Sequence, residues 1–128
     1  METAKKVILI IDDDEDFLYE MGETLHLSGY PAYTFSKSDQ VLPFLREKID
    51  VAFVDLKMEG TDGLQLVGRM RKHPLTREAR IFCITGFYTQ EECKQLLSNY
   101  LVEDFLIKPL RPLDIITCIE QVRAVHNW

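Results

Sequence analysis

The sequence predicts an α/β protein in which helices cover both faces of a parallel sheet. Apolar runs alternate with segments of helical periodicity about five times, a pattern typical of this class. The runs at residues 51–54 and 81–84 are apolar at successive positions, as in strands that are buried on both faces. With right-handed crossovers between successive strands, such a chain forms one parallel sheet.

Two strands and the helix between them are predicted in the N-terminal part. We expect the strands at residues 6–11 and 30–35. The second strand contains Pro31 and is more polar, which suits the edge of a sheet. Between the strands, apolar residues at helical spacing predict a helix that ends at Gly29. The apolar residues of this helix are Phe17, Leu18, Met21 and Leu25.

The segment after the second strand predicts an irregular helix. Ser36 or Ser38 is a suitable N-cap, and the helix would run to about residue 48. Pro43 lies within this segment, and beyond the first turn of a helix proline removes a backbone donor and clashes with the preceding turn. We therefore expect a late start or a kink.

The rest of the chain predicts three strands, each followed by a helix. The strands are expected at residues 51–54, 80–85 and 104–107. A capping box at residues 89–92 begins the second of these helices, and Pro112 suits the first turn of the last one. Apolar residues expected on the inner faces of the three helices are Leu64, Val67 and Met70; Cys93, Leu96 and Leu97; Leu113, Ile116, Ile119 and Val122.

One topology accounts for the polarity of these strands. In the flavodoxin-like, doubly wound order 2-1-3-4-5, a five-stranded parallel sheet has helices on both faces. The apolar first, third and fourth strands then lie in the middle, and the polar second strand lies at an edge. No linker, repeat or low-complexity segment is visible, so we expect residues 1–128 to form a single domain.

The composition narrows the class of function. A net charge of -6 and a pI near 5.0 disfavour nucleic-acid and anionic-membrane partners, because both require a basic face. The apolar run near the N-terminus is too short for a signal peptide or a membrane span. An odd number of cysteines without CxxC spacing favours free thiols in a reducing cytoplasm: Cys83, Cys93 and Cys118. We therefore expect a soluble cytoplasmic protein.

Polar side chains follow four of the predicted strands. In this topology Asp12 and Asp13 face Asp55 across the crevice beyond the carboxyl ends of the strands. Three crowded carboxylates raise one another's pKa or recruit a cation, and hard oxygen ligands favour Mg²⁺. Thr85 and Lys108 end the fourth and fifth strands and offer a hydroxyl and an ammonium to a phosphate group. The sequence therefore predicts a magnesium and phosphoryl site.

The motifs IIDDD, VDLKMEGTDG, ITG and FLIKPL, in this order, resemble the receiver domain of two-component response regulators. The resemblance spans essentially the whole chain. It implies that Asp55 is the phosphoacceptor, which attacks the phosphorus of a phosphohistidine to form an acyl phosphate. It also implies that Asp12, Asp13, Asp55 and the backbone carbonyl of Lys57 bind Mg²⁺, for which Mn²⁺ could substitute.

The resemblance also assigns the residues that respond to phosphorylation. Lys108 would pair with a phosphoryl oxygen, and the Thr85 hydroxyl would turn inward to bond another. Phe105 matches the aromatic switch residue of the family and would move towards the space near Thr85. The family usually has a cis bond before the proline that follows its lysine, here Pro109.

By the same resemblance, the chain is a signalling switch and not a metabolic enzyme, although it promotes its own phosphorylation and dephosphorylation. The implied donor is a histidine kinase or a histidine phosphotransfer protein, docking near the first helix. The implied target is a downstream protein effector or an output domain, and no output domain is visible in residues 1–128. The output face would include Lys94, Ser98 and Arg111.

The chain departs from the family at several positions. Glu59 stands where proline is common, and Gly86 replaces the usual alanine after the switch threonine. Phe105 lacks a tyrosine hydroxyl, so packing must distinguish its two positions. The family's glycine shortly before the last strand has no counterpart at residues 100–102. These departures affect rates and the output surface more than the phosphoacceptor.

Two alternatives belong to other classes. An aspartyl-phosphate phosphatase of the haloacid-dehalogenase type begins with DxD, which Asp12 and Asp14 satisfy. It also needs an acidic pair after its lysine, and after Lys108 the only acids are Asp114 and Glu120. The second alternative is a receiver-like interaction module that is not phosphorylated. Such modules typically lack one of the site residues, and all are present here.

Overall fold

A five-stranded parallel sheet forms the centre of the protein, as seen in a computed structural model that describes residues 6–58, 61–86, 91, 94–95, 98 and 102–126. The strand order is β2-β1-β3-β6-β7, which confirms the predicted order 2-1-3-4-5. The bounds are β1 Ile8–Ile11, β2 Ala32–Phe35, β3 Val51–Asp55, β6 Arg80–Thr85 and β7 Asp104–Ile107.

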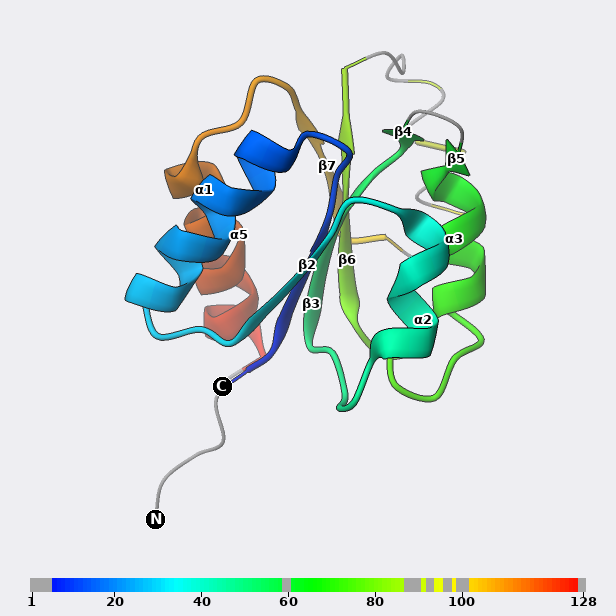
Figure 1. The fold of residues 1–128 in the computed structure, drawn as a ribbon, viewed down its shortest axis with the longest axis horizontal. Helices are drawn as coiled ribbons and strands as arrows, with labels where there is room; N and C mark the ends of the chain where they lie inside the picture. The colour runs from blue at the N-terminus through cyan, green and yellow to red at the C-terminus, as the bar shows by residue number, and fades with distance from the viewer. Residues whose placement is uncertain are drawn as a thin grey trace.

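Helices lie on both faces of this sheet, as predicted. In Figure 1, α1 and α5 cover one face, and α2 and α3 cover the other. The bounds are α1 Glu15–Leu27, α2 Val41–Phe44, α3 Gly63–Met70 and α5 Pro112–Val125. Of the helix predicted after residue 89, the described residues are helical and exposed: Glu91, Lys94, Gln95 and Ser98. Cys93, Leu96 and Leu97 lie outside the described residues.

The sheet separates two apolar layers because successive side chains of a strand point to opposite faces. In β1, Leu9 and Ile11 join the layer under α2 and α3, whereas Ile8 and Ile10 join the layer under α1 and α5. All four side chains are fully buried. The uninterrupted apolar runs therefore belong to strands covered on both faces, as the sequence predicted.

Local signals in the sequence define the ends of α1. Asp14 is its N-cap, and its carboxylate accepts a hydrogen bond from the Phe17 N–H. Gly29 follows the C-terminus with φ 87°, a backbone conformation that glycine adopts at low cost. The start of α5 also agrees with the prediction, since Pro112 is its first residue.

The second helix differs from its prediction. A short 3₁₀ turn at Ser38–Gln40 precedes α2, which places Pro43 in the first turn of the α-helix, where it is tolerated. The helix ends at Phe44 and not near residue 48, because the backbone of Leu45 is extended and its side chain enters the core. The expected late start is therefore confirmed, and the expected length is wrong.

Two smaller expectations also fail. A short antiparallel pair, β4 Lys57–Met58 with β5 Thr61–Asp62, follows β3 where we predicted no strand. Leu113 is 63% exposed, although we placed it on the inner face of the last helix. The buried positions of α5 are the predicted Ile119 and Val122 together with Ile115 and Cys118, because this stripe faces the sheet.

Candidate functional site

Asp12 and Asp55 lie together because their strands are neighbours in register. Ile11 pairs with Val54, so the next residues of β1 and β3 reach the same edge of the sheet. Both carboxylates are buried, with exposed fractions of 0% for Asp12 and 2% for Asp55. Two nearly buried carboxylates at the carboxyl end of a parallel sheet are costly unless another charge offsets them.

Lys108 supplies part of that offsetting charge. Its ammonium donates a hydrogen bond of 2.9 Å to Asp55 Oδ2 and lies 3.4 Å from Asp12 Oδ2. Burial by itself lowers the pKa of Lys108, but its contacts with Asp55 and Asp12 outweigh burial and raise that pKa. Lys108 therefore stays protonated and links the two carboxylates.

Asp12 remains under-compensated in this arrangement. Its Oδ1 accepts a hydrogen bond of 3.0 Å from the Asp14 N–H, whereas its buried Oδ2 has no hydrogen bond among the described residues. Burial, with a smaller contribution from the charge of Asp55, raises the pKa of Asp12 to about 6, although the Asp14 N–H and Lys108 oppose the rise. The ionised form of Asp12 thus requires a further positive partner.

A metal ion fits this requirement. Oxygen atoms of Asp12, Asp13 and Asp55 all lie within 4.8 Å of one another, and Asp13 is exposed to solvent. The unsatisfied Asp12 Oδ2 is the observation that favours a cation here, because carboxylate oxygens with access to water suit hard divalent ions. The clustered aspartates can therefore bind a metal ion.

Thr85 and Lys108 meet at the ends of β6 and β7. The Thr85 side chain is buried, and its carbonyl accepts a hydrogen bond of 3.0 Å from the Lys108 N–H. Since Asp55 pairs with Ile84, Thr85 lies one residue beyond the carboxylate along the neighbouring strand. The sheet register thus brings Thr85, Lys108 and Asp55 to one edge.

The other residues that the resemblance singled out lie nearby. Phe105 is half-buried against the core layer under α2 and α3 and pairs with Cys83. The Lys108–Pro109 peptide bond is cis, the isomer that the resemblance implied. The Lys57 backbone belongs to β4, which begins two residues after Asp55. Glu59 lies outside the described residues.

Gly63 contributes to the site in a way that we did not predict. A Cβ atom at this position would collide with the carbonyl oxygen of Asp55 and would lie 2.8 Å from the Leu56 Cα. The Gly63 N–H also donates to the Leu56 carbonyl. The first residue of α3 therefore packs on the backbone of the site. Its position in the TDG motif was the available signal, but only the fold brings it to Asp55.

The acids that follow Lys108 have structural roles. Asp114 Oδ2 accepts a hydrogen bond of 2.8 Å from the Arg111 N–H at the start of α5. Glu120 Oε1 accepts one of 2.7 Å from the Tyr30 hydroxyl. Neither provides the acidic pair that a phosphatase of the haloacid-dehalogenase type requires.

Among the residues that the structure describes, no helix is long and apolar enough to cross a membrane.

The comparison with known families agrees with this geometry. Residues 8–120 match the response regulator receiver domain. The chain therefore belongs to the response-regulator receiver family of two-component systems, whose members are phosphorylation-activated signalling switches.

Individual relatives are distant. The chain is 33% identical to the heme response regulator HssR of Staphylococcus aureus over 93% of this chain and 52% of that protein. It is 28% identical to the transcriptional regulatory protein BaeR of Escherichia coli, over 90% of this chain and 47% of BaeR. The chain thus spans about half the length of these regulators.

Solved structures show the same fold. The chemotaxis protein CheY4 of Vibrio cholerae is similar with a TM-score of 0.81 at 23% identity. The similar region covers 93% of this chain and 99% of that one.

Proposed function

We propose that Asp55 accepts a phosphoryl group in a magnesium-dependent reaction. The donor is the phosphohistidine of a histidine kinase or of a histidine phosphotransfer protein, in the cytoplasm. The observation that supports this proposal most directly is the position of the Asp55 carboxylate. It lies almost buried at a strand end, 2.9 Å from the Lys108 ammonium and beside two further carboxylates.

The chain's residues suit phosphoryl transfer because this reaction needs mainly alignment and neutralisation of charge. Asp55 attacks phosphorus opposite the leaving histidine nitrogen, so the new O–P bond forms as the N–P bond breaks. Lys108 then pairs with a phosphoryl oxygen. Asp12, Asp13, Asp55 and the Lys57 carbonyl would hold Mg²⁺ or Mn²⁺. The bound ion supplies positive charge that favours the attack between two anionic groups.

Phosphorylation changes the charge at the carboxyl edge of the sheet. The group adds about -1.5 to -2 charge and strong hydrogen-bond acceptors. The Thr85 hydroxyl turns to donate to one of these acceptors, and Phe105 moves with it. The surface of β7 and its neighbouring helices then presents a different face to a downstream effector or output domain.

Mass spectrometry tests this proposal. The chain is incubated with Mg²⁺ and a small phosphodonor such as acetyl phosphate, beside the variants Asp55→Asn and Asp50→Asn. We expect one phosphoryl group on the parent and on Asp50→Asn, located at Asp55, and none on Asp55→Asn. A parent chain that stays unmodified at saturating donor and Mg²⁺ contradicts the proposal. A label on another residue contradicts the assignment to Asp55.

A further inference from the structure

A polar cavity lies at the opposite end of the sheet from Asp55. It has a volume of about 500 Å³ and lies beside the N-terminal residues of β3 and β6. Five cationic side chains line it: Lys6, Lys48, Arg71, Arg77 and Arg80. Three carboxylates also line it: Asp50, Glu78 and Glu103. The lining therefore includes more cationic than anionic residues, in a chain whose net charge is -6.

Two of the three carboxylates have partners away from the arginines at the centre of the cavity. Asp50 Oδ2 accepts a hydrogen bond of 2.8 Å from the Val7 N–H. Glu78 pairs with Lys48 at 2.8 Å, and both side chains are more than half exposed. Glu103 is the one that approaches the central arginines, with Oε1 3.3 Å from Arg80 Nη1.

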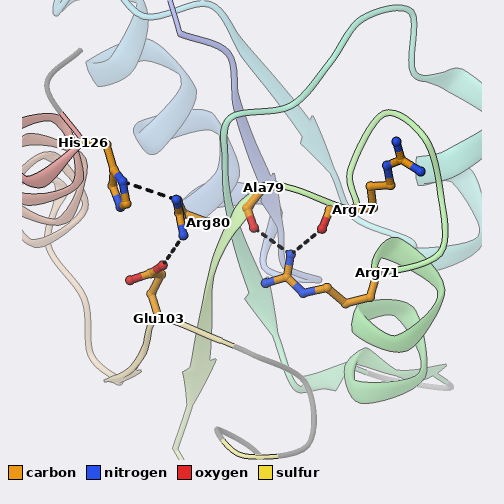
Figure 2. A network of polar contacts seen from close by, with 6 residues as sticks. All are labelled: Arg71, Arg77, Ala79, Arg80, Glu103 and His126. Atoms are coloured by element: carbon orange, nitrogen blue, oxygen red, sulfur yellow. Dashed lines mark hydrogen bonds and ion pairs between the residues drawn. The ribbon is translucent and has the colours of Figure 1, made fainter.

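Arg71 is held in place by backbone carbonyls. Its Nη1 donates to the carbonyl of Ala79 at 2.7 Å and to that of Arg77 at 3.1 Å. Figure 2 shows its guanidinium extending towards Arg80 and Glu103, whereas the Arg77 side chain points away. Burial lowers the pKa of Arg71, and the charge of Arg80 lowers it further. The structure therefore holds two repelling guanidinium groups near each other.

Arg80 is oriented from the other side. Its Nη2 lies 3.2 Å from His126 Nδ1 and its Nη1 contacts Glu103, as Figure 2 shows. Arg71 follows α3, Arg80 begins β6 and His126 follows α5, so three distant segments converge on this cavity. Such a convergence of preoriented cations is what an anion-binding site requires, because the arginines lose little further freedom on binding.

We propose that this cavity binds a small phosphorylated molecule whose phosphate group lies between Arg71 and Arg80. The cationic residues around the cavity favour an anion, and guanidinium groups bind phosphate oxygens with charge-assisted hydrogen bonds. The volume leaves room for more than the phosphate itself. In the free protein the Glu103 carboxylate pairs with Arg80, and it moves aside when the phosphate group binds.

This site differs from the phosphorylation site, and either could exist without the other. Arg80 and Thr85 are the first and last residues of β6, so the two sites lie at opposite ends of one strand. A ligand at Arg80 needs neither Asp55 nor a metal ion. The test is therefore made without Mg²⁺ and is repeated in the Asp55→Asn variant.

Two-dimensional ¹H–¹⁵N NMR with inorganic phosphate as the probe tests the proposal. Chloride is exchanged for phosphate at constant ionic strength, and citrate is titrated in parallel. We expect saturable shifts of the Ala79, Arg80 and Glu103 amides with phosphate, unchanged by Asp55→Asn. Absence of saturation overturns the proposal. Citrate binding as tight as phosphate binding overturns the choice of a phosphate group.

Charge variants distinguish a specific phosphate site from nonspecific electrostatic attraction of phosphate to the protein. Arg71→Gln and Arg80→Gln each weaken phosphate binding at least about tenfold, since each removes a charge-assisted hydrogen bond. Glu103→Gln removes the competing carboxylate and tightens binding several-fold, a gain that damage to the fold does not produce. Lys37→Gln removes an exposed charge outside the cavity and leaves binding unchanged. Equal affinities in all four variants overturn the proposal.

Discussion

The two ends of β3 carry the same type of side chain with opposite outcomes. Asp50 precedes the strand, and its carboxylate is satisfied by the Val7 N–H. Asp55 ends the strand, and its carboxylate meets a lysine and two further carboxylates. Asp50 therefore supports the fold, whereas Asp55 belongs to a site whose charges are not balanced by the chain alone.

The two ends of the whole sheet also differ in local charge. The carboxyl end gathers aspartates around a buried oxygen that has no hydrogen bond among the described residues, so it attracts cations. The amino end gathers lysines and arginines around a cavity, so it attracts anions. A net charge of -6 describes neither end. Partners must therefore be inferred from local charge and not from the composition.

The largest expected effect distinguishes two lysines. Lys108→Gln should slow phosphorylation by Mg²⁺ and acetyl phosphate roughly 10²- to 10³-fold, the usual loss when one preorganised charge at a reacting group is removed. Lys48→Gln, which removes an exposed lysine at the amino end, should leave the rate unchanged. The rates are measured by mass spectrometry over time. Equal rates for both variants would remove Lys108 from the mechanism.

Gly63 tests whether the backbone of the site is as constrained as its geometry indicates. Gly63→Ala should lower the free energy of unfolding by about 3 kcal/mol, because the added methyl group collides with the Asp55 carbonyl. In the control Gly22→Ala, the new Cβ on α1 lies at an ordinary contact distance, 3.6 Å, from Thr34 Cγ2 of β2. That variant should be as stable as the parent or up to about 1 kcal/mol more stable. Urea denaturation measures both, and similar stabilities would contradict the tight approach.

Asp50 should affect stability without affecting phosphorylation. Asp50→Ala leaves the Val7 N–H without its acceptor and should cost about 2 kcal/mol of unfolding free energy. The same change at the exposed Asp39 should cost little. Urea denaturation gives the stabilities, and the phosphorylation assay follows the same samples. A loss of phosphorylation in folded Asp50→Ala would contradict the division between the two ends of β3.

The pH dependence of metal binding gives the smallest expected effect. The raised pKa of Asp12, about 6, means that the carboxyl group holds a proton below that pH and must release it to bind a cation. Mg²⁺ affinity should therefore be level above pH 6 and fall about tenfold per pH unit below it. Calorimetric titration between pH 5 and 8 measures this. Asp12→Asn should weaken binding and remove the slope, and a level affinity in the parent would exclude Asp12 as a ligand.

Much of the fold follows from local patterns that the chain carries itself. The bounds of β6, β7 and the start of α5 agree with the prediction because buried strands and a proline at a first helical turn are local signals. The predicted length of the second helix was wrong because Leu45 has an extended backbone and its side chain enters the core. Leu113 was misplaced because helical spacing alone does not say which of two adjacent stripes faces the sheet.

The strand order and the residues at the carboxyl edge could be predicted from the chain, because apolar runs end at polar residues in a regular alternation. How these residues interact depends on the folded arrangement. Only the register of β1 and β3 brings Asp12 beside Asp55, and only the packing of α3 brings Gly63 to Asp55. The cavity at the amino end was not predictable, because Arg71, Arg80 and His126 lie on or beside three different elements that meet only in the folded chain.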